Sequence, residues 1–332
     1  MTAMSFLVWR LYRAQALIGL VLLAAFSALL LATGFSVASQ WHSALATCTT
    51  NGGCGNLSNT LFLGSHAVGF LIIMTLGVPV VIGVLCGAPL IAHEFETGTR
   101  DFAWMQGITR RRWLLVKAGW LLLAAAVLGG VVSGLVTWWS GPDNALQADA
   151  FGPGRFDIMG IVPVAYTLFA MALGIAAGLL LRRTVPAIGL TLAAYLAVRL
   201  LIDQWVRPHY LAAVTHLYGV TQNWVPNGAV WQLGAGVLDP SGRMLPMQNG
   251  ADIGPNVSVS TVPSVCASGA SQAQNNQVGV LTCMQKLGYR QFVTYQPANR
   301  YWAFQGIEFG IFVALAAALL AVTYVVITRR DA

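Results

Sequence analysis

The chain has 332 residues, of which 57% are hydrophobic and only 9% are charged. A soluble domain carries roughly 25% charged residues to cover its surface, so this composition and the mean hydropathy of +0.68 exclude an ordinary soluble enzyme and predict an all-α polytopic membrane protein. The net charge of +7 does not indicate a nucleic-acid partner, because the basic residues lie beside apolar runs and are not interleaved with aromatic residues for base stacking.

Residues 1–15 favour an amphipathic helix that lies in the cytoplasmic interface of the membrane. Phe6 and Trp9 recur at helical spacing, while Arg10 and Arg13 can face water. A frayed start of the first span is the alternative. No small-residue cleavage site follows a short apolar core, so we expect the first span to be retained as an anchor.

Six apolar runs are long enough to cross the hydrocarbon core, which needs about 20 residues. They cover residues 16–37, 67–92, 114–139, 158–181, 186–202 and 304–327. The basic residues of the short flanks predict a multi-pass protein of the plasma membrane with both termini in the cytoplasm. The expected organisation is an interfacial helix over 1–15, spans one to five over 16–202, an outer loop domain over 203–302, and the sixth span with a cytoplasmic tail over 303–332.

Four of the five cysteines fall in predicted outer segments. Cys48 and Cys54 lie in the first outer loop, and Cys266 and Cys283 lie in the last. Three connectivities are open, and we favour Cys48–Cys54 and Cys266–Cys283, because each closes a short local loop in an oxidising compartment. Free thiols or a metal site are the alternatives; disulfides are favoured because no histidine stands at zinc-ligand spacing. The last outer loop is therefore expected to be pinned by a disulfide, and its residues 230–245 favour a hairpin around an Asp-Pro-Ser-Gly turn.

The first cytoplasmic loop, residues 93–113, is longer than a connector needs. Between two glycines it favours one or two helical turns, with Asp101 near the positive end of the helix dipole. Phe102 and Met105 recur at a three-residue step and lie on one face. Thr109 is placed to cap the helix that follows.

A short helix with an apolar face suits docking into a groove on another protein. The alternative is an interfacial helix whose arginines pair with lipid phosphates. Glu94 and Glu96 count slightly against lipid, because anionic headgroups repel them. The spacing leaves both readings open.

Few ionisable residues lie within the spans. Arg199 and Asp203 stand one helical turn apart near the end of the fifth span and are expected to pair with each other. Glu308 lies near the outer start of the sixth span and is a possible cargo-path residue. No histidine pair stands at metal-ligand spacing in a span, so no metal is expected.

Two stretches resemble a known family. Residues 89–99 (Pro-Leu-Ile-Ala-His-Glu-Phe-Glu-Thr-Gly-Thr), followed by 109–113 (Thr-Arg-Arg-Arg-Trp) and Lys117, resemble the first cytoplasmic loop of actinobacterial ATP-binding-cassette (ABC) permeases of the second type. Residues 295–308 resemble the entry to the last span in that group. The layout of the whole chain is similar too, and the resemblance implies a type V exporter-like fold.

The resemblance also implies partners. In such permeases the first cytoplasmic loop holds a coupling helix that docks on an ATPase, and two permease units form the translocation path. The expected ATPase-coupling residues are Glu94, Glu96, Gly98, Thr99, Arg100, Asp101, Phe102, Met105, Arg110 and Arg111. The sequence has no G-x-x-x-x-G-K-[ST] motif, so this chain carries no cofactor, and ATP and Mg are expected on two copies of a separate ATPase subunit.

The sequence thus predicts a homodimeric permease of an ABC exporter, in contact with membrane lipid, for a hydrophobic or amphipathic cargo such as a drug in multidrug efflux, a lipid or a peptide. Two alternatives stay open: a membrane scaffold or sensor whose outer loop binds a ligand, and an ion-coupled carrier that works without ATP.

Overall fold

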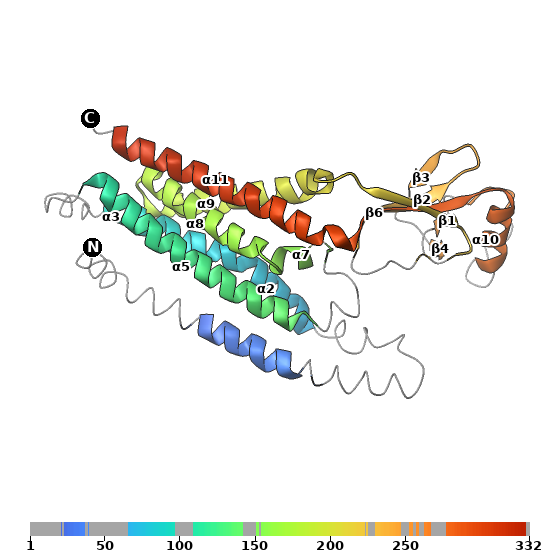
Figure 1. The fold of residues 1–332 in the computed structure, drawn as a ribbon, viewed down its shortest axis with the longest axis horizontal. Helices are drawn as coiled ribbons and strands as arrows, with labels where there is room; N and C mark the ends of the chain where they lie inside the picture. Colours follow the sequence, from blue (N-terminus) through green and yellow to red (C-terminus); the bar gives the residue numbers. More distant parts are fainter. Residues whose placement is uncertain are drawn as a thin grey trace. The chain divides into compact units, whose positions relative to one another are not determined.

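The computed structural model describes most of the chain, which Figure 1 draws as ribbons. The described residues are 21, 23–36, 39, 66–96, 109–141, 151–152, 154–222, 224, 230–246, 252–254, 257–258, 262–266 and 277–329. They belong to two compact units, one formed by Met1–Gln147, Gly154–Arg207 and Trp302–Ala332, the other by Ala148–Pro153 and Pro208–Tyr301. Each unit has its own apolar core.

The first unit is a bundle of long apolar helices. Its elements are α2 (His66–Ile82), the π-helical η2 (Gly83–Gly87), α3 (Ala88–Glu96), α5 (Arg110–Trp139), α7 (Arg155–Ile158), α8 (Val162–Leu181), α9 (Thr184–Leu201) with η3 (Ile202–Val206) and η4 (Arg207–His209), and α11 (Tyr301–Arg329). In the described part of the chain, five helices are long and apolar enough to cross a membrane: Ile73–Glu96, Arg111–Trp139, Val162–Leu181, Thr184–His209 and Ala298–Arg329. The protein is therefore polytopic and mostly helical.

The start of the chain is described only in part. Within the predicted first span, the structure describes a shorter apolar helix, Leu23–Ser36. The indole N–H of Trp139 on α5 donates to Thr33 Oγ1 at 3.2 Å, and Phe35 packs edge-on against Trp138. These contacts tie this helix to α5. The predicted interfacial helix over 1–15 lies outside the described residues.

The helix α8 is the centre of the bundle and packs against α2, α3, α5 and α9 (Figure 1). Its side chains are buried along nearly its whole length, whereas the surrounding spans expose large apolar side chains such as Leu123 and Leu196. An exposed apolar surface of this kind suits contact with lipid.

Each end of the bundle gathers a different set of residues. The end where α3 and α11 end and α5 and α9 begin is called the "loop end", after the loop 93–113. The opposite end, which contains residues 154–161, the end of α9 and the start of α11, is called the "plug end".

Small residues allow α8 to approach the helix formed by α2, η2 and α3 very closely. A Cβ atom on Gly174 would lie 2.5 Å from the carbonyl oxygen of Gly83, and one on Gly178 would lie 2.8 Å from that of Ala88. Close backbone approach through small residues is a common way for helices to associate in a bilayer, where lipid removes the hydrophobic driving force between them.

We expect Gly174→Ala to destabilise the bundle by about 1–3 kcal/mol, because the added methyl group meets backbone atoms that can only move apart. The check is the midpoint of thermal unfolding of the purified protein in detergent. Gly189→Ala on α9 is the matched control, since its Cβ atom would meet nothing within 4 Å. Equal midpoints for the two variants would contradict this packing.

The second unit corrects the all-α prediction. It contains a four-stranded antiparallel sheet with the strand order β1-β6-β2-β3, formed by β1 (Val214–Gly219), β2 (Trp231–Leu238), β3 (Met244–Pro246) and β6 (Arg290–Gln296). A short pair, β4 (Asp252–Gly254) and β5 (Val257–Ser258), and the helix α10 (Gln277–Lys286) complete it. The reason is local composition: β6 is rich in β-branched and aromatic residues, which favour strands.

A tight turn joins β2 to β3 in a hairpin. Asp239 Oδ1 accepts hydrogen bonds from the Arg243 N–H at 2.8 Å and the Ser241 hydroxyl at 2.6 Å, and Gly242 adopts a φ of +86°. These hydrogen bonds, that of the Ser241 hydroxyl above all, lower the pKa of the Asp239 carboxyl. A carboxylate that organises its own turn is a common feature of such sequences.

A disulfide fixes α10 in the second unit. Cys266 is bonded to Cys283, and both pack in a small core with Val237, Val280 and Met284. The crosslink closes a local loop, which restricts the unfolded chain. The other predicted pair, Cys48 and Cys54, lies outside the described residues.

Candidate functional site

At the loop end, an ion pair joins α3 to α5. Glu94 on α3 accepts a hydrogen bond from the ammonium group of Lys117 on α5, and both side chains are largely buried. The same ammonium group lies 4.9 Å from the ring centre of Trp113. Glu94, predicted to contact an ATPase, thus holds two helices of its own bundle together.

A second contact joins the end of α3 to the start of α9. The carboxylate of Glu96 accepts hydrogen bonds from the backbone N–H of Thr184 at 2.9 Å and from its hydroxyl at 2.6 Å. The N-terminus of α9 has unpaired N–H groups and a partial positive charge, so a carboxylate there acts as a cap supplied by another helix.

The start of α5 is also capped. The hydroxyl of Thr109 accepts a hydrogen bond from the backbone N–H of Arg112 at 3.4 Å, so the predicted cap is confirmed. Arg110 is the first residue of α5, and the guanidinium of Arg111 lies 5.9 Å from the ring centre of Tyr324 on α11. The other predicted coupling residues lie outside the described residues: Gly98, Thr99, Arg100, Asp101, Phe102 and Met105.

At the plug end, a short segment is buried inside the bundle. We name residues 154–161 "the plug"; they contain α7 and the turn that leads into α8. The plug is held on one side by α5, where the Ser133 hydroxyl donates to the carbonyl of Gly160 and Thr137 Oγ1 accepts from its N–H at 3.1 Å. Gly160 has a φ of +74°, which favours glycine at this turn.

On the other side, one amide on α11 holds the plug. Oε1 of Gln305 accepts from the backbone N–H groups of Ile161 and Val162, both at 3.0 Å, and its Nε2 donates to the carbonyls of Phe156 at 3.1 Å and Met159 at 3.2 Å. Gln305 is fully buried. It supplies the partners that non-helical backbone needs inside a membrane protein.

Charged side chains from the plug, from α9 with its continuation through η3 and η4, and from α11 meet at one place. Arg207 donates to Asp157 at 2.5 Å and, through two nitrogens, to Glu308 at 2.7 and 2.8 Å. Arg199 lies 3.1 Å from Asp157 and 3.3 Å from Glu308. Asp203 forms an ion pair with Arg207 at 2.5 Å. We call these five residues and Tyr166 "the ion cluster".

The ion cluster corrects one expectation. Arg199 does not pair with Asp203, because its guanidinium reaches carboxylates of the plug and of α11 in the interior of the bundle. Asp203 pairs one turn further along, with Arg207. Glu308 is completely buried, and its role in a cargo path stays a prediction.

Aromatic groups and opposite charges compensate the burial of the cluster. The guanidinium of Arg199 lies 3.7 Å from the ring centre of Tyr166, whose hydroxyl is 3.0 Å from Asp157 and 2.5 Å from Glu308. The buried carboxyl group of Asp157 faces the guanidinium groups of both Arg199 and Arg207. Opposite charges at this distance offset the cost of burying each other.

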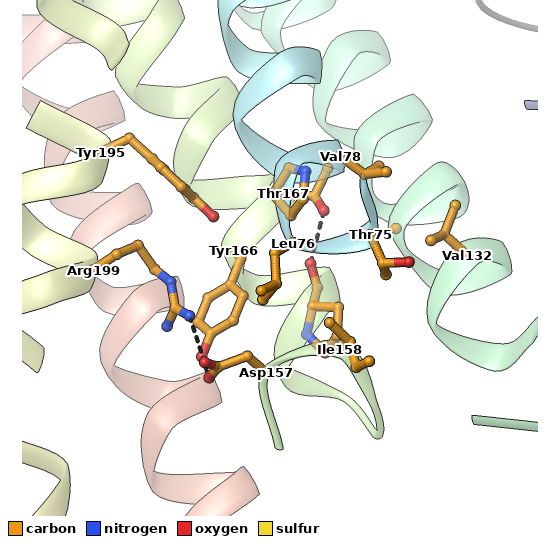
Figure 2. A pocket seen from close by; sticks show the side chains of 13 residues that line it. Thr75, Leu76, Val78, Val132, Asp157, Ile158, Tyr166, Thr167, Tyr195 and Arg199 are labelled. Carbon is orange, nitrogen blue, oxygen red and sulfur yellow. Dashed lines mark hydrogen bonds and ion pairs between the residues drawn. The ribbon is translucent and has the colours of Figure 1, made fainter. Parts of the chain in front are cut away.

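A small cavity lies against the cluster, as Figure 2 shows. Its volume is ≈ 20 Å³, room for about one water molecule. Asp157, Tyr166, Tyr195 and Arg199 line it on one side, and the rest is lined by apolar residues of α2, α5, α8 and the plug together with Thr75 and Thr167. Within the ranges that the structure describes, no three His, Cys, Asp or Glu side chains are grouped as metal ligands.

The comparisons with known proteins assign the chain to a family. A family model described as ABC-2 membrane transporter related matches residues 20–207, which is more than half of the chain. The chain belongs to the ABC-2 membrane transporter related family. Comparison with curated proteins and with solved structures finds no match.

This ABC-2 permease is therefore a membrane subunit of an ABC transporter. Subunits of this kind are not themselves catalytic and normally work with an ATPase partner. The matched residues include the plug, Arg199, Arg207 and both ends of the loop 93–113, whereas Gln305 and Glu308 lie outside the match.

Sequence reasoning missed three residues of the permease that matter most at the plug end: Asp157, Arg207 and Gln305. One signal for them exists in the sequence. Opposite charges flank the predicted spans at Asp157 and Arg207, and a charge next to a span requires a partner or water. Gln305 gives no such signal, because a single amide near a span end is common.

Proposed function

We propose that this protein is the permease subunit of an ATP-driven exporter, that two copies form the translocation path, and that each binds an ATPase chain through residues 93–113. The observation that carries the proposal is the family match over residues 20–207, which contains this loop. The few charges in the spans favour a hydrophobic or amphipathic cargo.

The contacts at the loop end support a coupling role for the loop. Its first residues are attached to α5 through Glu94 and to α9 through Glu96, and its last residues run directly into the capped start of α5. A displacement of residues 97–108 by a bound ATPase would therefore act directly on two spans. A loop that merely connected two helices would not need these attachments.

The distribution of basic residues supports a cytoplasmic position for the loop end. The three arginines at the start of α5, Arg182 and Arg183 after α8, and Arg329 at the end of α11 all belong to this end. Short basic flanks of spans stay in the cytoplasm. The second unit, which carries the Cys266–Cys283 disulfide, would then face the oxidising side.

Phe102→Arg tests the docking. We expect the affinity-tagged variant, purified from membranes of its native host, to bring down at least about tenfold less ATPase chain than the wild type, because an unpaired charge in an apolar groove costs more than the roughly 1.4 kcal/mol that corresponds to this factor. The readout is the ratio of ATPase to permease by quantitative mass spectrometry. Val185→Arg is the matched control: this exposed apolar residue also lies at the loop end but outside the loop, and its variant should retain the ATPase.

Other outcomes would favour the alternatives. If the wild-type chain brings down no ATPase, the alternative function as a membrane scaffold or sensor is favoured. Transport by the purified chain in vesicles without ATP would instead indicate an ion-coupled carrier.

A further inference from the structure

Arg199 depends on the plug for its nearest carboxylate. Its guanidinium has two acidic partners among the described residues, Asp157 at 3.1 Å and Glu308 at 3.3 Å. Arg207 differs, because it keeps two hydrogen bonds to Glu308 and an ion pair to Asp203 even without Asp157. A displacement of Asp157 would therefore leave Arg199 with Glu308 as its one acidic partner among the described residues, whereas Arg207 would keep two.

The charges of the cluster define what could replace Asp157. The cluster holds the carboxylates of Asp157, Asp203 and Glu308 and the guanidiniums of Arg199 and Arg207, which is an excess of one negative charge. If Asp157 leaves, the remaining four groups are balanced. One monoanionic group at Arg199 restores the original charge, whereas a cation or a dianion does not.

The segment that carries Asp157 is short, and its contacts with the rest of the bundle can be named one by one. The plug is held by side chains of α5 and α11, by the cluster, and by its direct continuation into α8. The cavity beside Asp157 is lined by Arg199, Tyr166 and Tyr195, by apolar side chains such as Leu76 and Val132, and by Thr75 and Thr167 (Figure 2). At ≈ 20 Å³ it is too small for a cargo, but a displacement of Asp157, which lines it, would enlarge it next to Arg199 and Tyr166.

We infer that Arg199 binds a single anionic headgroup of an amphipathic cargo, and that Asp157 occupies the place of this headgroup in the present conformation. The inference rests on the proposed function and names the class of cargo. The cargo's anionic group contacts Arg199 and the Tyr166 hydroxyl, and its apolar part lies along the side chains of α2 and α5 that line the cavity. Asp157 then acts as an internal competitor that keeps the site closed when no cargo is bound.

The test is binding to the full chain in phosphatidylcholine nanodiscs, without ATP or ATPase. The probe is radiolabelled dodecanesulfonate, a monoanion at all relevant pH values. The competitors are dodecylphosphocholine, which has the same tail and no net charge, and methanesulfonate, which has the same headgroup and no tail. We expect both competitors to bind at least tenfold more weakly than the probe. In Asp157→Asn, the affinity for the probe should rise about tenfold, because the competing carboxylate is gone.

The double variant Asp157→Asn/Arg199→Gln is the matched control. It removes one charge of each sign, so the net charge of the cluster is unchanged and neither Asp157 nor Arg199 is left charged without the other. This variant should lose the preference for the anionic probe. Its thermal unfolding midpoint, measured alongside, verifies that it folds. Should Asp157→Asn fail to fold, the comparison of the wild type with the double variant still shows whether the preference for the anionic probe depends on Arg199.

Three results would each overturn the inference: equal binding of dodecylphosphocholine, equal binding of methanesulfonate, or a double variant with the full anionic preference. This experiment is independent of the ATPase. A chain that brings down its ATPase but shows no anionic preference loses only the inference, whereas a chain that binds the probe but no ATPase loses the proposed function.

Discussion

Arg207→Met is expected to lower the free energy of unfolding by about 3–5 kcal/mol, the cost of breaking a buried ion pair by removing one partner. Arg207 is almost completely buried and is the only group that contacts all three carboxylates of the cluster among the described residues. Without it, Glu308 keeps only the 3.3 Å contact with Arg199 and the Tyr166 hydroxyl as polar partners in the cluster. The measurement is reversible unfolding of the purified protein in mixed micelles.

The double variant Arg207→Met/Glu308→Met tests whether the loss of stability in Arg207→Met comes from the carboxylate that is left without its partner. It removes one charge of each sign and leaves Arg199 with Asp157, so it should recover much of the lost stability, because apolar groups can replace a complete buried ion pair at little cost. Unfolding of Arg207→Met at the wild-type midpoint would show that the cluster is not closed in the folded protein.

Gln305→Leu is expected to destabilise the plug by about 3 kcal/mol. The leucine leaves the N–H groups of Ile161 and Val162 and two carbonyls of the plug without this partner, and each buried unsatisfied group costs about 1–3 kcal/mol before local rearrangement or water reduces the sum. Hydrogen exchange of the amides of Ile161 and Val162, followed by mass spectrometry, measures the effect. Faster exchange should be confined to the plug and the first turn of α8.

Gln305→Glu provides the control for this prediction. It keeps the oxygen that accepts from the two N–H groups but loses the donor to the carbonyls of Phe156 and Met159. The two amides should therefore stay protected while the overall stability falls. If Gln305→Leu leaves their exchange unchanged, the amide of Gln305 does not hold the plug.

The parts of the fold that depend on local patterns could be predicted from the sequence. Five of the predicted spans coincide with the helices that are long and apolar enough to cross a membrane, because hydropathy over about 20 residues reflects the bilayer thickness. The cap at Thr109 and the turn that begins at Asp239 depend on residues within four positions of each other. Local signals of this kind do not need knowledge of the rest of the chain.

The features that depend on distant residues could not be predicted. Sequence distance favoured Asp203 as the partner of Arg199, but the partners come from positions 157 and 308. The strand pairing of β1 with β6 joins residues 214–219 to 290–295, and neither strand shows where its partner is. No sign in the sequence indicated that the carboxylates of Glu94 and Glu96 bind Lys117 and Thr184 within the chain, and their contact with an ATPase stays a prediction.

The contacts of α9 have a mechanical consequence. Its first residue, Thr184, is bound by Glu96, and Arg207 is the first residue of η4, which follows α9 and η3, so about 35 Å of helix at 1.5 Å per residue separates the two attachments. A helix resists stretching far more than side-chain contacts do. Axial sliding of α9 by one or two ångströms would consequently strain the contact at Thr184 and the contact at Arg207 together, so a movement at the loop end would be felt at the plug end.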